Sequence, residues 1–581
     1  MASSGINSPA TADIAYFSME IALQSEIPTY SGGLGVLAGD MLRSAADLEI
    51  PMVGITLAHR LGYFRQKLDA NGNQKAEPER WDPANFADPT NVRVWVQLEG
   101  RPVAITAWQY RLRGISGGVV PVYLLDTDLP ENTEYDRTLT SELYGGDQRY
   151  RLMQEAVLGL GGAELLDALG YARLSIYHMN EGHAALLAIG LLQRIARAGR
   201  AGRNEVECVR NRCVFTTHTP VPAGHDKFPR PFVASILGAG PVELLDTAQC
   251  FRDDLLNMTF VALRFSRFIN GVAMQHGEVS AHMFPQYSIR AITNGVHAVS
   301  WTSPPFRDLF DRRLPGWRYD NLCLRYAIRI PLDEIQNAHR AGKQRMLAEI
   351  QSRHGVALQE NVFTIGFARR AAAYKRADLL FTDIERLRRI GRSAGPIQIL
   401  YGGKAHPQDE SGQEMIRRVL GSAASLEGSN VRVIYLSNYE IELAGLLTSG
   451  VDLWLNTPLR PYEASGTSGM KAALNGIPGL SILDGWWIEG CHEGLTGWAI
   501  GDRDAPSDPV QESSALYQKL ESIILPMYYG NGAAYTEIMR SVISVNASFF
   551  NTNRMLEQYL NEAYFPRENA PSLAESARQG A

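Results

Sequence analysis

The sequence predicts an α/β protein built from two domains, each with a parallel sheet. Its 581 residues are too many for one compact core. Short β-branched runs alternate with helical stretches, which is typical of parallel sheets covered on both faces. Polar and charged clusters follow several of these runs, and open parallel sheets bind ligands outside the carboxyl ends of their strands. Two such sheets facing each other would form a deep cleft.

The alternation is clearest in the second half of the chain. The expected strands there are Val362–Phe367, Ile397–Tyr401, Val431–Leu436, Val451–Leu455 and Leu480–Leu483. The expected helices between them are Ala377–Ile390, Gln413–Ala423, Glu440–Thr448 and Met470–Leu474. Connections of this kind imply right-handed crossovers, and therefore parallel strands.

The first half repeats this pattern with longer excursions. We expect a hairpin that turns at Asn71-Gly72, and strands at Met52–Ile55, Leu174–Tyr177, Val214–Thr216 and Arg290–Ile292. The predicted units are a Rossmann-like domain over residues 1–300, a connecting helical segment over 301–355 and a second Rossmann-like domain over 356–540. A final helix over 541–570 is expected to cross back to the first domain. Residues 571–581 are mostly small and polar, so we expect a disordered tail.

Composition and charge favour a soluble enzyme. The net charge of −6 and the pI of about 6.1 provide no basic field for nucleic acid or an anionic membrane. There is neither an apolar run as long as a membrane span nor a signal-peptide pattern at the N-terminus. The five cysteines are scattered without zinc-site spacing, so we expect buried free thiols, no metal and a cytoplasmic location.

The densest cluster of candidate site residues follows the run Val451–Leu455. In Glu463-Ala-Ser-Gly-Thr-Ser-Gly-Met-Lys471, small residues offer backbone N–H groups and hydroxyls at the start of a helix. That composition is typical of an anion cradle. The segment is not a Walker A loop, because its lysine does not directly follow the last glycine. Taken alone, it fits equally well a turn that caps a helix, with Lys471 solvated.

Basic residues follow two other strands of this half. Four cations fall within eight residues after Val362–Phe367, where guanidinium forks would suit phosphate: Arg369, Arg370, Lys375 and Arg376. The segment Tyr401-Gly-Gly-Lys-Ala-His406 adds a flexible turn with one more cation. For each segment alone, a solvated basic helix start or a plain helix-entry loop is at least as good an interpretation.

The first half contributes a glycine loop and two polar clusters. Tyr30-Ser-Gly-Gly-Leu-Gly35 precedes a helical run, a weak signal because such a loop can simply permit tight packing. Asn180-Glu-Gly-His183 and Thr293-Asn-Gly-Val-His297 each follow a strand. Their side chains suit sugar hydroxyls, although a single histidine is more often a core or loop residue.

These segments occur in an order that, with Tyr16-Phe-Ser-Met-Glu20 and Ser437-Asn-Tyr439, resembles the glycogen and α-glucan (maltodextrin) phosphorylase family. The resemblance runs from about residue 14 to residue 565 and is closest to the short bacterial and archaeal branch. It implies a GT-B architecture, in which two Rossmann-like domains face each other across a deep cleft. It also implies a pyridoxal-phosphate-dependent hexosyltransferase. Such an enzyme uses inorganic phosphate to release the non-reducing-end glucose of an α-1,4-glucan, reversibly and with retention, as α-glucose 1-phosphate.

The resemblance also implies residue roles. Pyridoxal phosphate would be attached to Lys471 in the second domain, with Tyr439, Thr467 and Lys404 around it. Arg369, Arg370 and Lys375 look like the cations that hold the substrate and cofactor phosphates, and His183 is a further candidate catalytic residue, at a sugar-contacting position. The first domain would bind glucan. The substrate-binding candidates are Gly32, Gly33, Leu34, Asn294, Glu463, Ser465 and Gly466.

The candidate site residues fit that chemistry. Retaining cleavage needs an acid for the leaving oxygen, and in the family the substrate phosphate serves as that acid, beside the cofactor phosphate. The chain shows no obvious carboxylate pair, which argues against a hydrolase. It also departs from long-chain members, because Ala372 and Ala373 replace a His-Glu pair and Gly469 replaces an asparagine.

Two other functions stay open. A nucleotide-sugar-dependent glycan synthase of GT-B fold shares the basic residues but has no cofactor lysine. An inactive glucan-binding paralogue would bind glucan without releasing phosphorylated sugar, although the lysine and the cations are all intact here. The expected partners are α-glucan and inorganic phosphate or glucose 1-phosphate, without nucleic acid or membrane. Glucan length and oligomeric state are not specified, and a homo-oligomer is one option.

Overall fold

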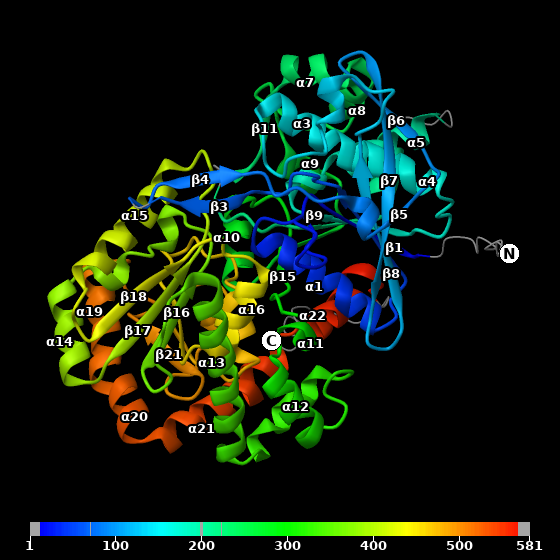
Figure 1. The fold of residues 1–581 in the computed structure, drawn as a ribbon. Coiled ribbons are helices and arrows are strands. Elements are labelled where there is room, and N and C mark those ends of the chain that lie inside the picture. Colours follow the sequence, from blue (N-terminus) through cyan, green and yellow to red (C-terminus); the bar gives the residue numbers. More distant parts are fainter. Residues whose placement is uncertain (1–11, 70, 198–201, 222–223, 567–581) are drawn as a thin grey trace, which may run out of the picture.

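The computed structural model describes residues 12–69, 71–197, 202–221 and 224–566. Two large sheets with helices on both faces form its two halves (Figure 1). The α/β fold expected from the sequence is therefore confirmed. The 571–581 tail lies outside the described residues.

The first sheet has ten strands in the order β15-β14-β10-β9-β1-β2-β8-β7-β5, and β6 pairs with β7. The strands from β15 to β8 run parallel, whereas β7 is antiparallel to β8, β5 and β6. The bounds are β1 (Ile14–Ser18), β2 (Met52–Leu57), β5 (Asp88–Pro89), β6 (Val94–Leu98), β7 (Arg101–Arg113), β8 (Val119–Asp126), β9 (Ile176–Asn180), β10 (Cys213–Thr216), β14 (Phe268–Gly271) and β15 (Arg290–Ala291).

The second sheet has six strands, all parallel, in the order β18-β17-β16-β19-β20-β21. Its strands β16 and β17 are buried along their whole length, as expected where helices cover both faces. The bounds are β16 (Phe363–Ala368), β17 (Ile397–Gly402), β18 (Val431–Leu436), β19 (Leu453–Asn456), β20 (Gly479–Ile482) and β21 (Gly497–Ile500).

The main helices cover these sheets. In the first half they are α1 (Gly33–Asp47), α3 (Gln148–Ala156), α4 (Gly162–Ala168), α5 (Leu186–Arg197), α6 (Arg203–Arg210), α7 (Arg230–Leu237), α8 (Ala239–Thr247), α9 (Met258–Arg264) and α10 (Met274–Met283). Then follow α11 (Ala298–Trp301), α12 (Pro304–Arg313), α13 (Leu332–His354), α14 (Ile384–Ser393), α15 (Glu410–Ser425), α16 (Ile441–Gly450), α17 (Ser468–Ala473), α19 (Pro509–Lys519), α20 (Leu525–Gly530), α21 (Gly532–Val542) and α22 (Thr552–Tyr559).

One helix prediction was wrong at its start. The segment expected to be helical from Ala377 instead forms a short 3₁₀ turn at Leu379–Phe381, and α14 begins only at Ile384. The cause is the cap: the carboxylate of Asp383 accepts a hydrogen bond from the backbone N–H of Arg386 at 2.8 Å, which fixes the first turn of the helix there.

The expected hairpin is present and bridges the two halves. Strands β3 (Arg65–Leu68) and β4 (Gln74–Glu77) pair antiparallel across a turn in which Gly72 has a φ of +78°. The hairpin lies across the second domain beside α15 (Figure 1). Gln66 and Asn438 exchange two hydrogen bonds of 3.0 and 2.9 Å, each from a backbone N–H to the other's side-chain oxygen. Gln74 makes a similar reciprocal pair with the backbone of Ala405.

The end of the described chain packs against the first sheet. Tyr559 at the end of α22 and Tyr564 at the end of the following π-helix, Leu560–Tyr564, are both buried against strands β9 and β10. The hydroxyl of Tyr564 lies 2.6 Å from Nδ1 of His178, and that of Tyr559 lies 2.9 Å from the hydroxyl of Thr216.

All five cysteines are free thiols. Cys213 and Cys250 are buried, but Cys208 on α6 is exposed, so the expectation of buried thiols was wrong there. No helix in the described ranges is long and apolar enough to cross a membrane.

Candidate active site

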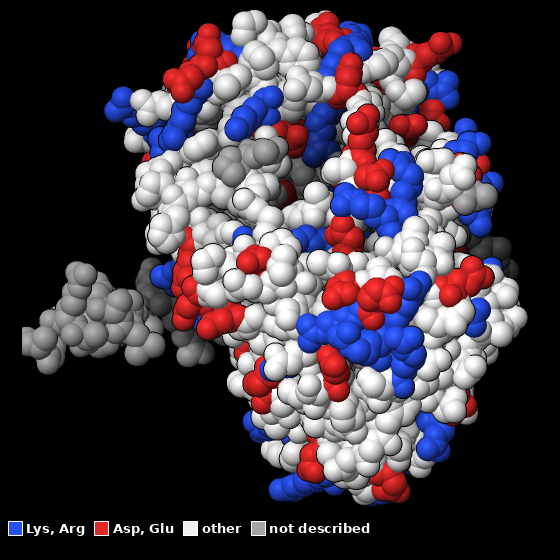
Figure 2. Space-filling view, turned by 90° about the vertical axis from the view of Figure 1, so that its left-hand side faces the viewer, with Lys and Arg blue, Asp and Glu red and all other residues white. Residues whose placement is uncertain are grey.

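The predicted site residues of the second domain lie just past the carboxyl ends of strands β16, β17 and β19. Figure 2 shows a hollow between the upper and lower parts of one face, with basic and acidic side chains gathered around it. Parallel strands bring their following loops to one sheet edge, so residues far apart in the chain meet there.

A buried carboxylate joins two of the predicted cations. The Nζ of Lys375 lies 2.6 Å from Oε2 of Glu463, and a guanidinium nitrogen of Arg369 donates to the same oxygen. Burial alone would raise the pKa of Glu463, but the charges of Arg369 and Lys375 lower it to about 2. The carboxylate is therefore ionised and occupies the position where an anion would meet both cations.

Lys471 lies in α17 with its amine enclosed by protein. Burial lowers the pKa of this lysine to about 8, although the charge of Asp40 opposes that shift. Its Nζ sits 3.8 Å from the centroid of the Trp301 ring. A lysine with a lowered pKa is unprotonated more often than a solvated lysine, and the unprotonated amine is the form that attacks a carbonyl carbon.

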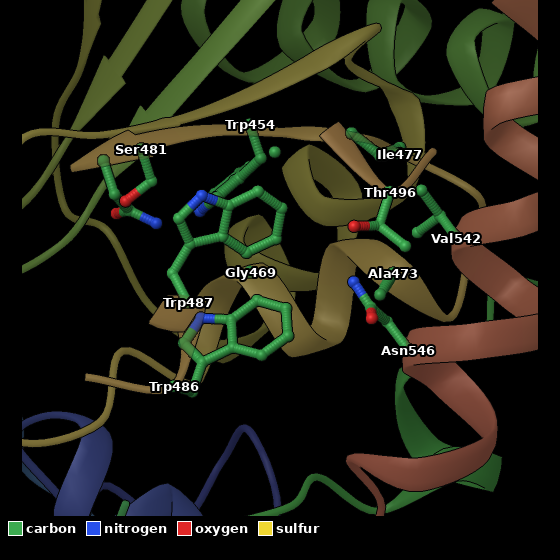
Figure 3. A pocket seen from close by; sticks show the side chains of 12 residues that line it. Trp454, Gly469, Ala473, Ile477, Ser481, Trp486, Trp487, Thr496, Val542 and Asn546 are labelled. Carbon is green, nitrogen blue, oxygen red and sulfur yellow. The ribbon is translucent and has the colours of Figure 1, made fainter. Parts of the chain in front are cut away.

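The loop before Lys471 is packed tightly against tryptophans. Figure 3 shows the small pocket behind the loop, lined by Trp454, Trp486, Trp487 and Gly469 among others. A Cβ on Gly469 would lie 2.8 Å from Cζ2 of Trp486, closer than real Cβ contacts. The Trp486 ring has little freedom, since it packs edge-on against Trp487 and Phe550. The asparagine of long-chain relatives would not fit here without rearrangement.

Replacing Gly469 by alanine should therefore destabilise the protein by about 1–3 kcal/mol through overpacking. Gly445 in α16 is a matched control, because it is also helical and a Cβ there would meet nothing within 4 Å. Gly445→Ala should be neutral or slightly stabilising. Urea midpoints of the two variants measure the difference, and equal midpoints would show that the Trp486 ring yields freely.

The glycine loop of the first domain is held from behind by Glu20. The carboxylate Oε2 of Glu20 accepts from the backbone N–H groups of Ser31 at 2.6 Å and Gly32 at 3.3 Å, and Oε1 accepts from the Tyr144 hydroxyl at 2.9 Å. In front of the loop the space is open, because a Cβ on Gly32 or Gly33 would meet nothing within 4 Å. Leu34 continues into α1.

Several predicted site residues carry buried polar atoms without a partner in the described chain. They are Nε and one terminal nitrogen of Arg369, Nδ1 of His183, Oδ1 of Asn294 and Oγ of Ser465. Such groups are rare in native structures unless a ligand, ion or water satisfies them. Burial also lowers the pKa of His183 to about 3, so this ring is neutral and can accept or donate one hydrogen bond. This pattern fits a polar ligand with phosphate and hydroxyl groups.

Other predicted residues are placed differently. Arg370 is exposed rather than enclosed with Arg369. The Nζ of Lys404 donates to the carbonyl of Phe64 in the first domain at 2.8 Å. Tyr439 packs its ring near Gly402, and Thr467 precedes α17, where its carbonyl accepts from the Lys471 N–H at 3.2 Å. Gly466 has a φ of +88°, which favours glycine at this turn.

Asp484 was not predicted from the sequence, although it lies directly behind Glu463. Its two oxygens accept from the backbone N–H groups of Glu463 and Gly485, each at 2.9 Å. Burial, aided by the negative charge of Glu463, raises the pKa of Asp484 to about 7. Asp484 belongs to no recognisable motif. The role of Glu20 was not predicted either, although Glu20 ends the family-like segment Tyr16-Phe-Ser-Met-Glu20.

Asp484 should make stability fall as pH rises from about 4 to about 7. In that window the folded protein keeps a proton that the unfolded chain releases, so unfolding becomes easier with increasing pH. The side chain of asparagine does not titrate, so Asp484→Asn should reduce this pH-dependent decrease in the free energy of unfolding by up to about 4 kcal/mol. Thermal midpoints at pH 5 and pH 8 test this, with Asp333→Asn, at an exposed position, as control. An unchanged pH difference in the Asp484 variant would contradict the assignment.

Comparisons with known proteins agree with this site. A family model described as carbohydrate phosphorylase matches residues 21–114 and 241–494. A maltodextrin phosphorylase of Thermococcus litoralis is 38% identical, covering 95% of this chain and 70% of the relative. A glycogen phosphorylase of Mycobacterium tuberculosis is 36% identical, covering 97% of this chain and 73% of the relative. One of Aquifex aeolicus is 34% identical, covering 95% of this chain and 86% of the relative. The chain belongs to the carbohydrate phosphorylase family, whose members have a GT-B fold and use pyridoxal phosphate.

Proposed function

We propose that the protein is an α-1,4-glucan phosphorylase. It transfers the non-reducing-end glucose of an α-glucan to inorganic phosphate, reversibly and with retention, to give α-glucose 1-phosphate. The observation that carries this proposal is the convergence of Arg369 and Lys375 on Glu463, in the loop that leads to the buried amine of Lys471. Relatives named as maltodextrin and glycogen phosphorylases support it.

The residues present fit pyridoxal phosphate. Lys471 offers a buried amine with a lowered pKa of about 8, and Thr467, Tyr439 and Lys404 lie at loops from the same sheet edge. We propose that these four residues hold the cofactor. When bound, pyridoxal phosphate supplies a phosphate group beside the substrate phosphate.

Arg369, Lys375 and Arg370 stabilise the phosphates electrostatically in this proposal. Two neighbouring phosphates repel each other, which raises their pKa values and favours a shared proton. Arg369 and Lys375 offset that repulsion and position the substrate phosphate, with Arg370 at the exposed side. When phosphate binds, it competes with Glu463 for the same two cations. The displaced carboxylate is then free to accept a hydrogen bond from a glucose hydroxyl.

The remaining candidates surround the sugar and the phosphate. Asn294 and His183 of the first domain would bond glucose hydroxyls through their unpartnered atoms. Ser465 and Gly466 would contact the glucose or its phosphate from the second domain. The open loop at Gly32, Gly33 and Leu34 would present its backbone to the phosphate.

A phosphorolysis assay tests the function. Purified protein incubated with maltoheptaose and inorganic phosphate should release α-glucose 1-phosphate and show the near-ultraviolet absorbance of bound pyridoxal phosphate. Transfer from a nucleotide sugar without that absorbance would identify the glycan synthase instead. Glucan binding with no product in either assay would identify an inactive paralogue.

Glu463→Gln should lower glucan turnover on the order of 10²-fold, because its hydrogen bond to the sugar weakens. The KM for phosphate should not rise, since the competing charge at Arg369 and Lys375 is gone. Glu512→Gln is a matched control, because Glu512 forms a buried ion pair with Arg376 outside this cluster. Loss of pyridoxal phosphate with sugar kinetics intact would instead assign Glu463 to cofactor binding.

We also propose the domain division, assembly and location. The division is a glucan-binding domain over 1–300, a connection over 301–355, a cofactor domain over 356–540 and a returning helix over 541–570. Free cysteines support the reducing cytoplasm. A homo-oligomer is supported by the exposed apolar residues Tyr319, Leu322, Tyr326 and Ile328, which follow α12.

A further inference from the structure

We infer that Asp40 is a positioning residue for Lys471 and that it acts through Trp301. The inference rests on the proposed role of Lys471 as the cofactor lysine. Asp40 belongs to α1 of the first domain, Trp301 ends the short helix α11 in the connection, and Lys471 lies in α17 of the second domain. Three parts of the chain therefore meet at one amine.

The contact between Trp301 and Lys471 is close. The Nζ of Lys471 lies 3.8 Å from the ring centroid of Trp301, within the range in which an ammonium is attracted to the face of an indole. Trp301 is only 5% exposed and Lys471 only 6%, so water competes little with this contact. The ring both attracts the amine and limits where it can move.

Asp40 fixes the orientation of that ring. Its Oδ2 accepts a hydrogen bond of 2.7 Å from the indole Nε1 of Trp301 and one of 3.1 Å from the backbone N–H of His297. Oδ1 faces Arg43 at 3.4 Å. At 1% exposure, Asp40 is a buried charge, and all three groups around it donate to it. Such a carboxylate holds its donors in a narrow range of geometry.

Asn475 holds the backbone around Trp301 by hydrogen bonds. The side-chain nitrogen of Asn475 donates to the carbonyl of Trp301 at 2.9 Å and to that of Lys471 at 3.1 Å. The Asn475 oxygen accepts from the N–H of Ser303 at 2.8 Å. Trp301 thus has its carbonyl anchored to the helix of Lys471 and its indole anchored to α1.

The consequence is a link between the two domains through one side chain. Helix α1 begins at the glycine loop, whose residues are proposed to contact the substrate phosphate. A displacement of α1 moves Asp40, turns the indole and changes the surroundings of the Lys471 amine. The first domain therefore contributes to how the second domain holds its cofactor, without touching it.

Three variants separate the parts of this link. Asp40→Ala removes the tie, Trp301→Phe keeps a ring but removes the N–H, and Asp40→Asn keeps an acceptor oxygen while removing the charge. Asp311→Ala is a matched control, because Asp311 accepts from the indole Nε1 of Trp317 at 2.8 Å away from the site. Circular dichroism melts show whether each variant is folded, and Trp301→Phe serves as the test if the alanine variant is not.

The first measurement uses the protein without cofactor. The rate at which acetic anhydride modifies Lys471, followed by peptide mass mapping, should rise about tenfold in Asp40→Ala and in Trp301→Phe, as expected for the loss of an indole contact. Asp40→Asn should restore most of the protection. The double variant should match either single variant, because two residues that act through each other are not additive. Equal rates in Asp40→Ala and Asp311→Ala, or additive effects, would overturn the inference.

The second measurement uses the loaded protein. The rate of loss of the pyridoxal phosphate absorbance on dilution should rise in the same order among the variants. Borohydride trapping of the wild-type protein locates the cofactor independently. A label on another lysine would refute the proposed cofactor site, while the acetylation rates would still decide whether Asp40 and Trp301 position Lys471.

Discussion

Replacing Lys471 by alanine should leave a folded protein that neither retains pyridoxal phosphate nor releases glucose 1-phosphate. The buried amine is the proposed attachment point, and no neighbouring side chain on α17 can replace it. Removal of a residue on which the whole reaction depends typically costs three orders of magnitude or more, so turnover should fall at least about 10³-fold. Phosphorolysis rates and the absorbance of the purified protein measure both effects.

Two controls make this result specific. Lys75→Ala changes an exposed lysine on the hairpin and should behave as wild type. Lys404→Ala removes a half-buried lysine that is also proposed to hold the cofactor, without removing the attachment point. If Lys471→Ala still binds the cofactor covalently while Lys404→Ala does not, then Lys404 is the attachment point and the assignment is wrong.

Alanine at Arg369 or at Lys375 should lower kcat/KM for phosphate on the order of 10²- to 10³-fold. Each loses a charge-assisted bond in a partly dry site, where such bonds contribute a few kcal/mol. Because both cations share the carboxylate of Glu463, the double variant should lose less than the product of the two single effects. Steady-state kinetics with phosphate varied at saturating glucan provide the measurement.

The matched control for this pair is Arg417→Ala, an arginine on α15 that pairs with Glu414 at the surface. It should leave phosphate kinetics unchanged. Near-normal turnover in either Arg369→Ala or Lys375→Ala would mean that the two cations only neutralise Glu463. Cofactor content should be measured in parallel, since a lowered content would attribute the loss to the cofactor phosphate.

The sequence predicted most of the sheets because burial on both faces leaves a continuous apolar run. The runs at Val362–Phe367 and Ile397–Tyr401 reappear as strands with almost the same limits. The antiparallel edge formed by β5, β6 and β7 was not predicted, because the alternation of buried and exposed residues is irregular along the long strand β7. The start of α14 was also mispredicted. The spacing of apolar residues favoured a helix from Ala377, but the N-cap Asp383 makes the helix begin at Ile384.

The site was predictable where its residues stand together in motifs. The loop from Glu463 to Lys471 and the cations after β16 are contiguous, so their chemistry is visible in the sequence. Asp40 and Trp301 are 261 residues apart, and neither residue type suggests a partner before the chain is folded. Asp484 follows a strand in the same way as the predicted residues, but one carboxylate without a motif gives no signal of what it faces.

The hairpin β3–β4 has a consequence for how glucan chains can enter. It fastens the two halves of the molecule at a place outside the connection, through the hydrogen bonds of Gln66 with Asn438 and of Gln74 with Ala405. Wide separation of the halves would break these hydrogen bonds together. A glucan chain should therefore reach the site without wide separation of the two halves, so the hairpin limits how far the enzyme can open to admit it.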